Sequence, residues 1–203
     1  MDAERSKALR HFKKADPVMH SVAKSTNIEQ RKAVTSNDYF WHLCYEIISQ
    51  QLAGKAAHAI CQRFKKLFPG GRITPEQTLK IKEKTMRKAG MSWAKASFVR
   101  DLARKVNDGT LDLKKLKQMD NAQAIEVLMQ VKGIGPWTAE MFLMFTLQRQ
   151  DVFSHGDLGL RKAIIKHYSL GKDAGREEIE EIARKWSPYR TYASRVLWKS
   201  LEV

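Results

Sequence analysis

A glycine-containing turn in the middle of the chain could hold a phosphate group through its main chain. Val131-Lys132-Gly133-Ile134-Gly135 interrupts two helical patterns, and Pro136 suits the first position of the second helix. Glycine allows backbone conformations that other residues resist, so successive amides can face outward at a helix N-terminus, where anions bind. With Lys132 beside them, these amides could hold a nucleic-acid backbone without reading bases. Gly-x-Gly is also common in ordinary interhelical turns, so both interpretations stay open.

The overall charge favours a polyanionic partner. The 203 residues contain 37 Lys and Arg against 22 Asp and Glu, for a formal net charge of +15, and the pI is near 9.9. Binding DNA or RNA neutralises phosphates and releases counterions, which drives association. Charge alone is also compatible with a ribosome-associated or merely basic protein. With 43% hydrophobic residues, the chain is long enough to bury a core.

The two cysteines and six histidines do not form a metal-binding pattern. Cys44 and Cys61 lie in apolar helical stretches, where a thiol acts as a small hydrophobic group. The histidines are scattered without paired spacing, so neither an iron–sulfur cluster nor a zinc site is expected. The charged N-terminus excludes an ordinary secretory signal, and no apolar run reaches membrane-spanning length. We therefore expect an intracellular protein with no membrane partner and no cofactor held by side chains.

Apolar residues recur at helical spacing along almost the whole chain, so the predicted fold class is all-α. A helix of 39–50 carries a clear apolar stripe. Thr74 is placed to cap another helix, with Pro75 at its first position. Asp157 directly precedes the helical pattern of 158–168, where aspartate is a common N-cap. The remaining helices are predicted at about 54–68, 81–88, 93–106, 113–118, 122–130, 137–147, 177–186 and 188–201.

Three stretches of the chain resemble markers of one known protein family. They are the hairpin segment 131–143 with the Asp157-Leu158-Gly159-Leu160 run that follows it, the segment 47–57, and the segment 89–96. The sequence resembles the helix-hairpin-helix, Gly/Pro-rich loop and aspartate (HhH-GPD) DNA glycosylases, within them the 3-methyladenine DNA glycosylase II branch, over about residues 16–200. The resemblance implies a fold of two helical lobes with a DNA-binding cleft and no β domain. We expect one lobe at about 36–130 and the other at about 1–35 with 131–203.

The resemblance gives Asp157 the role of the catalytic carboxylate. Such a group would stabilise the positive charge that develops on the deoxyribose as the base departs, and could orient or deprotonate the attacking water. In bifunctional relatives, a lysine two positions after the second hairpin glycine attacks the sugar as an amine. Trp137 occupies that position here, after Gly135. The resemblance therefore implies a monofunctional hydrolase without lyase activity.

The resemblance also assigns residues to the extruded base and to DNA. Trp137 and Trp198 match aromatic positions of the base pocket, where an electron-rich ring suits a cationic alkylated purine; core packing is the alternative for Trp198. Gln51 and Leu52 match a minor-groove wedge that fills the gap left by the flipped nucleotide, with an ordinary helix junction as the alternative. The wedge loop comprises Gln50, Gln51, Leu52, Gly54 and Lys55, and the DNA-binding hairpin comprises Val131, Lys132, Gly133, Ile134 and Gly135.

Two details near these motifs concern an ion and a histidine. The main-chain carbonyls of Met129, Val131 and Ile134 match places where family hairpins hold a monovalent cation, so the resemblance implies a structural Na⁺ or K⁺ there. Before the aspartate, Ser154-His155-Gly156 departs from relatives, many of which carry a proline. His155 could therefore alter the pocket or contact DNA.

The combined prediction is a monomeric base excision repair enzyme acting on double-stranded DNA. It would flip and excise alkylated purines, with 3-methyladenine as the main substrate and 7-methylguanine as a further candidate. Two alternatives stay open: a non-catalytic helix-hairpin-helix protein that binds DNA structures, and a glycosylase for deaminated or etheno-modified purines. The expected compartment is that of the DNA, either a prokaryotic cytoplasm or nucleoid, or a nucleus.

Overall fold

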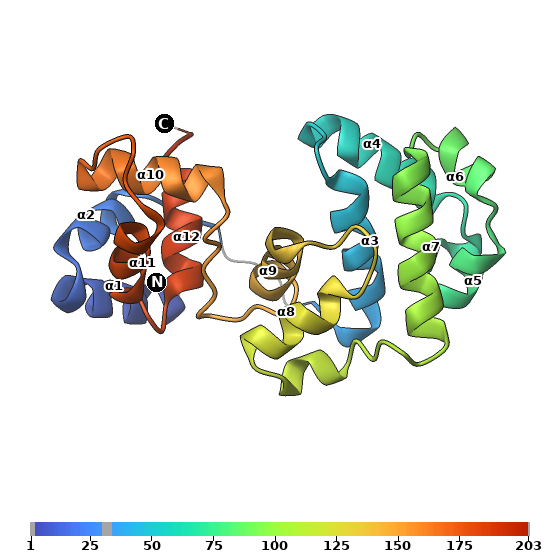
Figure 1. The fold of residues 1–203 in the computed structure, drawn as a ribbon, viewed down its shortest axis with the longest axis horizontal. Coiled ribbons are helices and arrows are strands. Elements are labelled where there is room, and N and C mark those ends of the chain that lie inside the picture. The colour runs from blue at the N-terminus through green and yellow to red at the C-terminus, as the bar shows by residue number, and fades with distance from the viewer. Residues whose placement is uncertain (1–2, 30–33, 203) are drawn as a thin grey trace. The chain divides into compact units, whose positions relative to one another are not determined.

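The protein is built from helices. The computed structural model describes residues 3–29 and 34–202, and no β-strand occurs within these ranges, so the predicted all-α class is confirmed. The chain divides into two compact units, one of Met1–Ala33 with Gln148–Val203 and the other of Val34–Leu147. Figure 1 labels the helices of both units. Within the described ranges, no helix is both long and apolar enough to cross a bilayer.

The division between the units falls later in the chain than the predicted boundary at residue 130. Helix α9 (Pro136–Phe145) and the hairpin before it belong to the unit 34–147, whereas the sequence placed them with the C-terminal helices. The reason is packing, because α9 contacts both α8 (Asn121–Met129) and α3 (Tyr39–Ser49). The fully buried rings of Phe142 and Tyr39 meet edge-to-face, with centroids 5.8 Å apart. The hairpin is therefore supported by the same core as α3.

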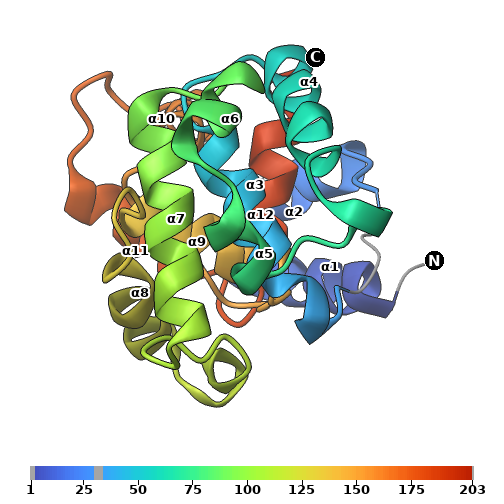
Figure 2. The same ribbon diagram turned by 90° about the vertical axis from the view of Figure 1, so that its right-hand side faces the viewer.

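Helix α3 lies at the centre of the unit 34–147. Its predicted apolar stripe is buried throughout, at Phe40, Leu43, Cys44, Ile47 and Ile48. Around it pack α4 (Gly54–Lys65), α7 (Trp93–Asn107) and α9. The short helices α5 (Pro75–Lys80) and α6 (Glu83–Lys88) pack on α7, as Figure 2 shows. Three 3-10 turns, at Ser36–Asp38, Pro69–Gly71 and Lys115–Gln118, complete the unit.

Several helix ends in this unit differ from the prediction because local hydrogen bonds set them. Thr74 caps α5 as predicted, with its Oγ1 accepting from the Gln77 amide. The helix predicted to begin at residue 81 begins at Glu83, since the Ile81 amide still bonds back to Thr78 in α5. The helix predicted at 113–118 is only the 3-10 turn Lys115–Gln118.

The other unit packs N-terminal helices against C-terminal ones. It contains α1 (Ala3–Ala15), α2 (Pro17–Ser25), α10 (Leu158–Tyr168), α11 (Arg176–Arg184) and α12 (Arg190–Lys199). The last helix begins at Arg190 rather than 188, because the Tyr189 amide bonds back to the carbonyl of Trp186. Buried Asp16 accepts hydrogen bonds from Tyr168 Oη (2.6 Å) and Trp186 Nε1 (2.9 Å). A buried carboxylate needs such donors, and these two tie the N-terminal helices to the rest of the unit.

Candidate functional site

The predicted hairpin is a tight turn that requires glycine at position 133. Val131 and Ile134 are buried and anchor the turn. Gly133 has φ +81°, and a Cβ built there would lie 2.1 Å from Cδ2 of Phe98 on α7. Any side chain would both strain the backbone and collide with that ring. Gly135, by contrast, has φ −97° and open space around it, and it serves as the N-cap of α9.

Fewer hairpin amides face outward than the sequence predicted. The Lys132 amide donates to Oδ2 of Asp101 on α7 (3.0 Å), and the Ile134 amide donates to the Val131 carbonyl (3.1 Å). In the part of the chain that the structure describes, the amides of Gly133 and Gly135 have no hydrogen-bond acceptor. These two N–H groups are the ones available to a phosphate oxygen.

Asp101 supports the hairpin from inside the unit and was not recognised in the sequence. Its carboxylate is buried and also accepts from Lys105 Nζ at 2.7 Å. Burial acts to raise the pKa of Asp101, but the Lys105 ammonium and the Lys132 amide outweigh it and hold the pKa below its ordinary value. An aspartate inside a helical pattern gives no local signal of this role, because its partner lies 31 residues away.

The carbonyls proposed for a monovalent cation differ in how they are used. The Val131 carbonyl already accepts from Ile134, although a carbonyl has a second lone pair. The carbonyls of Met129 and Ile134 have no donor among the described residues. Carbonyl oxygens without donors suit a cation, so the ion stays a prediction that the hairpin geometry permits.

The predicted wedge loop is held at one residue and exposed at the next. Gln50 Nε2 donates to the carbonyl of Gly133 (2.8 Å) and to Oγ1 of Thr138 on α9 (3.1 Å). Gln51 is exposed and has φ +55°, the left-handed region. Leu52 is 37% exposed. The structure thus joins two motifs 83 residues apart, the loop and the hairpin.

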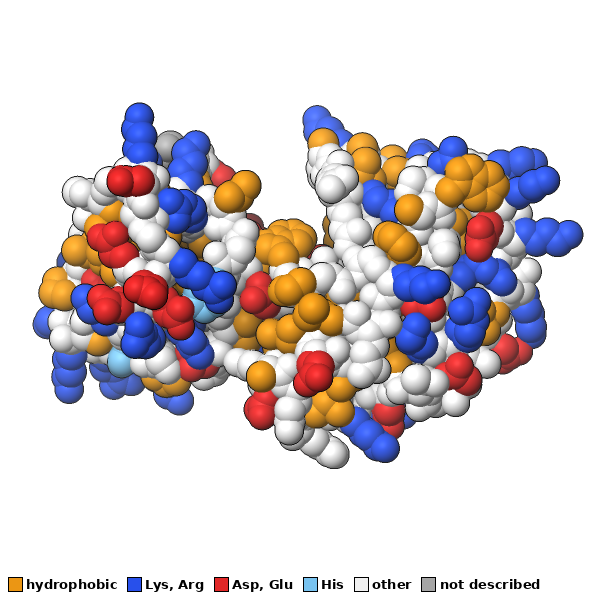
Figure 3. Space-filling view, viewed as in Figure 1, with side chains coloured by type: hydrophobic (Ala, Val, Ile, Leu, Met, Phe, Trp, Pro, Cys, Tyr) orange, Lys and Arg blue, Asp and Glu red, His pale blue; other side chains and the backbone are white. Residues whose placement is uncertain are grey.

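Gly54 and Lys55 open helix α4 and are both exposed, as is Lys132 in the hairpin. Lys55 and Lys132 form part of a wide distribution of basic side chains. Figure 3 shows Lys and Arg over the visible surface of each unit. Because exposed cations attract phosphates additively, we expect each of these lysines to contribute modestly to nucleic-acid binding.

Asp157 is the N-cap of α10 and is also bonded to a tryptophan. Its Oδ1 accepts from the Leu160 amide (2.7 Å) and from Trp198 Nε1 on α12 (2.9 Å). A Cβ built at Gly159 would lie 3.1 Å from the same oxygen and 3.2 Å from the Trp198 ring, so only glycine fits there without displacing them. Two N–H donors on one oxygen hold the Asp157 carboxylate in a fixed orientation.

The two tryptophans predicted for the base pocket have different surroundings. Trp137, at the second position of α9, is 43% exposed. Trp198 is half-buried against the core of the other unit and bonds to Asp157. The sequence left core packing as the alternative for Trp198. The structure adds a contact that neither interpretation anticipated, because it depends on α10 and α12 packing together.

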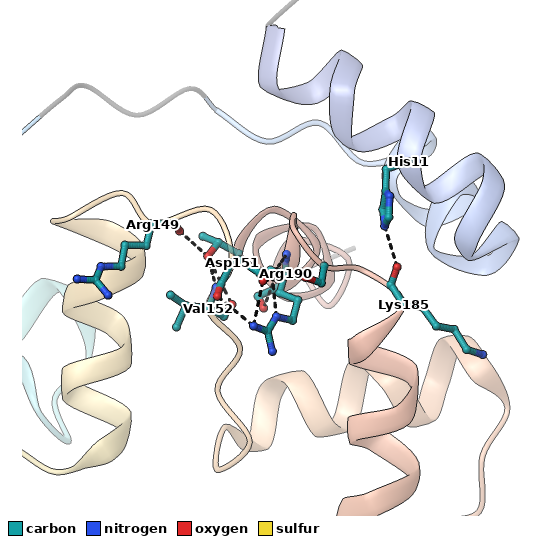
Figure 4. Close-up of polar contacts among 9 residues, drawn as sticks. His11, Arg149, Asp151, Val152, Lys185 and Arg190 are labelled. Carbon is teal, nitrogen blue, oxygen red and sulfur yellow. Dashed lines mark hydrogen bonds and ion pairs between the residues drawn. The ribbon is translucent and has the colours of Figure 1, made fainter. Parts of the chain in front are cut away.

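The segment that leads to Asp157 is fixed by α12. Arg190 Nε donates to Oδ1 of Asp151 (2.7 Å), and Thr191 Oγ1 donates to the Arg149 carbonyl (2.6 Å), as Figure 4 shows. Burial acts to raise the pKa of Asp151, but hydrogen bonds from Arg190 and Ser187 overcome it, and the pKa lies below its ordinary value. The same close-up shows His11 of α1 donating to the Lys185 carbonyl. The path of residues 149–152 is therefore set by side chains near 190.

His155, the departure noted in the sequence, is half-buried. Its ring packs edge-to-face on Phe153, with centroids 4.9 Å apart. Its Nδ1 is buried and has no hydrogen-bond partner among the described residues. Burial lowers the pKa of His155, with Arg176 and Arg190 acting in the same direction and Glu180 against them. A neutral imidazole is the form expected at neutral pH, so His155 adds no charge for phosphate binding.

The helical fold, the glycine hairpin on a helix N-terminus and the fixed aspartate after it are the features that define a DNA glycosylase family. The family model described as "HhH-GPD superfamily base excision DNA repair protein" matches residues 44–188, which is most of the chain. The chain belongs to the HhH-GPD superfamily of base excision DNA repair proteins.

Individual relatives narrow this class. The chain is 32% identical to DNA-3-methyladenine glycosylase 1 of Schizosaccharomyces pombe over 86% of its own length and 77% of that protein. It is 33% identical to a putative DNA-3-methyladenine glycosylase of Bacillus subtilis. The matched region spans 77% of this chain but only 56% of that relative. Among solved structures, S. pombe Mag1 in complex with abasic DNA matches with TM-score 0.85 and 30% identity, covering 97% of both chains. A DNA-3-methyladenine glycosidase from Bacillus halodurans matches with TM-score 0.83 and 34% identity, over 98% of this chain and 89% of that one.

Proposed function

We propose that the protein is a monofunctional DNA glycosylase that removes alkylated purines from duplex DNA by hydrolysis. The observation that carries the proposal is the Asp157 carboxylate, fixed by the start of α10 and by Trp198, in a chain of the HhH-GPD superfamily. One relative is named DNA-3-methyladenine glycosylase 1 and another carries the same name as putative, so 3-methyladenine is the proposed main substrate and 7-methylguanine a second one. Monomeric action on DNA inside the cell completes the proposal.

Asp157 acts by electrostatics in this mechanism. As the glycosidic bond breaks, positive charge develops on the sugar, and a carboxylate already in place stabilises it without reorganisation. The two hydrogen bonds to Oδ1 fix the orientation of the carboxylate before any substrate binds, which is the preorganisation that charge stabilisation requires. We therefore assign it charge stabilisation and orientation of water ahead of proton abstraction.

The absence of an amine after the hairpin supports hydrolysis over strand cleavage. Trp137 occupies the position of the lysine in bifunctional relatives, and an indole cannot form a Schiff base. Its exposed ring suits stacking on a cationic purine. The expected product is an intact abasic site.

The test is release of methylated bases from duplex DNA treated with a methylating agent. We would compare the wild type with Asp157→Asn and run the product DNA before and after alkali. We expect release by the wild type, a loss of at least about a hundredfold in the variant, and strand breaks only after alkali. Breaks before alkali would contradict the monofunctional assignment.

The chain offers a matched control for this substitution. Asp120 caps α8 as Asp157 caps α10, accepting from the Gln123 amide at 2.8 Å. Asp120→Asn makes the same change at a helix start, so it should cost similar stability and leave base release intact. Equal losses in both variants would mean that Asp157 is only a cap. Binding without release by the wild type would favour the non-catalytic binder or a glycosylase for deaminated or etheno-modified purines, which profiling on those lesions separates.

A further inference from the structure

The end of helix α3 is closed by a lysine from another helix. Lys95, in the first turn of α7, donates from Nζ to the carbonyls of Ile48 (2.8 Å) and Gln50 (2.6 Å). The last carbonyls of a helix lack intrahelical partners and carry partial negative charge, so an ammonium group is a suitable donor for them. Lys95 is half-buried. The ammonium group of Lys95 therefore caps the C-terminal end of α3 and holds the backbone of Gln50, the residue that follows the helix.

Gln50 is held on its other side by the hairpin. Its side-chain amide donates to the Gly133 carbonyl and to Thr138, a buried residue of α9. The backbone of Gln50 is thus attached to α7 and its side chain to the hairpin. Together Lys95 and Gln50 form what we call the brace.

The residue after the brace has an unusual backbone. Gln51 has φ +55° and is exposed. A non-glycine residue in the left-handed region is disfavoured and persists when its surroundings hold it there. The Leu52 amide bonds back to the Ser49 carbonyl (3.2 Å), which closes the turn around Gln51. The brace contacts act on the residues directly before Gln51, because Lys95 holds the carbonyls of Ile48 and Gln50.

We infer that Lys95 and Gln50 are positioning residues that hold Gln51 out from the protein surface as the side chain that replaces the flipped base. This inference rests on the proposed function and separates three residues that the sequence left together. Gln50 is committed to the hairpin. Of the two exposed residues that follow, Gln51 and Leu52, we assign the insertion to Gln51, whose backbone is held at φ +55°. Because the backbone around Gln51 is already ordered, insertion costs less loop ordering, which favours the flipped state. The brace also links insertion of Gln51 to DNA binding by the hairpin, because Gln50 directly precedes Gln51 and its side chain contacts the hairpin.

The test follows base flipping and excision separately. A duplex carrying 2-aminopurine beside a stable abasic-site analogue reports unstacking on binding, and methylated duplex reports the single-turnover excision rate. Lys95→Met keeps the length of the side chain and removes the ammonium. We expect it to lower the excision rate at saturating protein by tenfold or more and to reduce the 2-aminopurine signal, with far less change in Kd.

A double-variant comparison identifies what the lysine acts through. If Lys95 works by positioning Gln51, then Gln51→Ala should reproduce the loss, and Lys95→Met combined with Gln51→Ala should be no worse than Gln51→Ala alone. Lys95→Arg, which can still donate to both carbonyls, should restore part of the flipping signal. Lys84→Met, at an exposed position of α6, controls for the loss of one positive charge.

Additive losses in the double variant, or an unchanged 2-aminopurine signal in Lys95→Met, would overturn the inference. Thermal melting of each variant shows whether the loss is only structural, since unfolding would lower binding and flipping in parallel. The 2-aminopurine signal on the abasic duplex reports unstacking without any base being released. Failure of the proposed function, seen as no base release by the wild type, is therefore distinguishable from failure of the brace, seen in the 2-aminopurine signal.

Discussion

The hairpin of residues 131–135 and the aspartate at 157 hold their functional groups in different ways. The hairpin offers main-chain amides, and its shape depends on a glycine against Phe98 and on buried Asp101. Asp157 offers a side chain, oriented by one amide and one indole N–H. Damage to a main-chain site should therefore appear first in stability and DNA binding. Damage to a side-chain site should appear first in the rate of reaction.

The largest effect is expected at Gly133. Gly133→Ala places a Cβ in the Phe98 ring and strains a backbone with φ +81°, so we expect a loss of about 2–4 kcal/mol in the free energy of unfolding. Gly135→Ala, with open space and negative φ, is the matched control and should cost less than about 1 kcal/mol. Urea unfolding of both variants measures this. Equal losses would show that the Phe98 contact does not define the turn.

Asp101→Asn should weaken the hairpin from within. The asparagine side chain keeps the shape of the aspartate but lacks the negative charge that the Lys105 ammonium and the Lys132 amide both contact. We expect a loss of about 1–3 kcal/mol in the free energy of unfolding at pH 7. Because folding depresses the pKa of Asp101, its stabilisation is present above about pH 4 and is lost as pH falls through the lower folded pKa. The variant should therefore lose less stability than the wild type on acidification below pH 4. Asp112→Asn, at a more exposed aspartate, is the control, and parallel acid profiles for Asp101→Asn and the wild type would refute the assignment.

Trp198→Phe should separate rate from stability. The phenyl ring fills much of the same space, but Asp157 loses the indole N–H. We expect the single-turnover rate to fall about tenfold, the value of one hydrogen bond to a charged group, while the melting temperature changes little. Trp186→Phe removes a buried indole N–H bonded to Asp16 instead, and should lower stability without a specific loss of rate. A melting loss in Trp198→Phe as large as in Trp186→Phe would make Trp198 a packing residue only.

The smallest effect is expected at Lys132. Its exposed ammonium contributes through charge, so Lys132→Ala should lower the slope of log binding constant against log salt by about 0.9. Lys172→Ala, at another exposed lysine that lies outside the hairpin, is a comparison of equal charge. Affinity measured across a salt series tests this, and an unchanged slope in Lys132→Ala would remove it from the phosphate contacts.

The helical class, the glycine turn and the placement of Asp157 at a helix start are all predictable from consecutive residues. These are local features, since apolar spacing, capping residues and glycine act within a few residues. The family motifs are also local, because each consists of consecutive residues that can be matched without knowing their neighbours in space. Helix starts such as Glu83 and Arg190 are harder to predict from the sequence, because single hydrogen bonds set them.

Which distant residues contact the motifs depends on how the helices pack against one another. The hydrogen bond between Lys132 and Asp101 spans 31 positions of the chain, and the bond between Trp198 and Asp157 spans 41 positions. The bond between Gln50 and Gly133 spans 83 positions. Helix packing also places the hairpin in the unit 34–147, where α9 packs on α3. Nothing in the local pattern of Gln50, Asp101 or Lys95 distinguishes them from other polar residues on helices. Their roles arise from packing between helices, which brings donors and acceptors together that the sequence keeps apart.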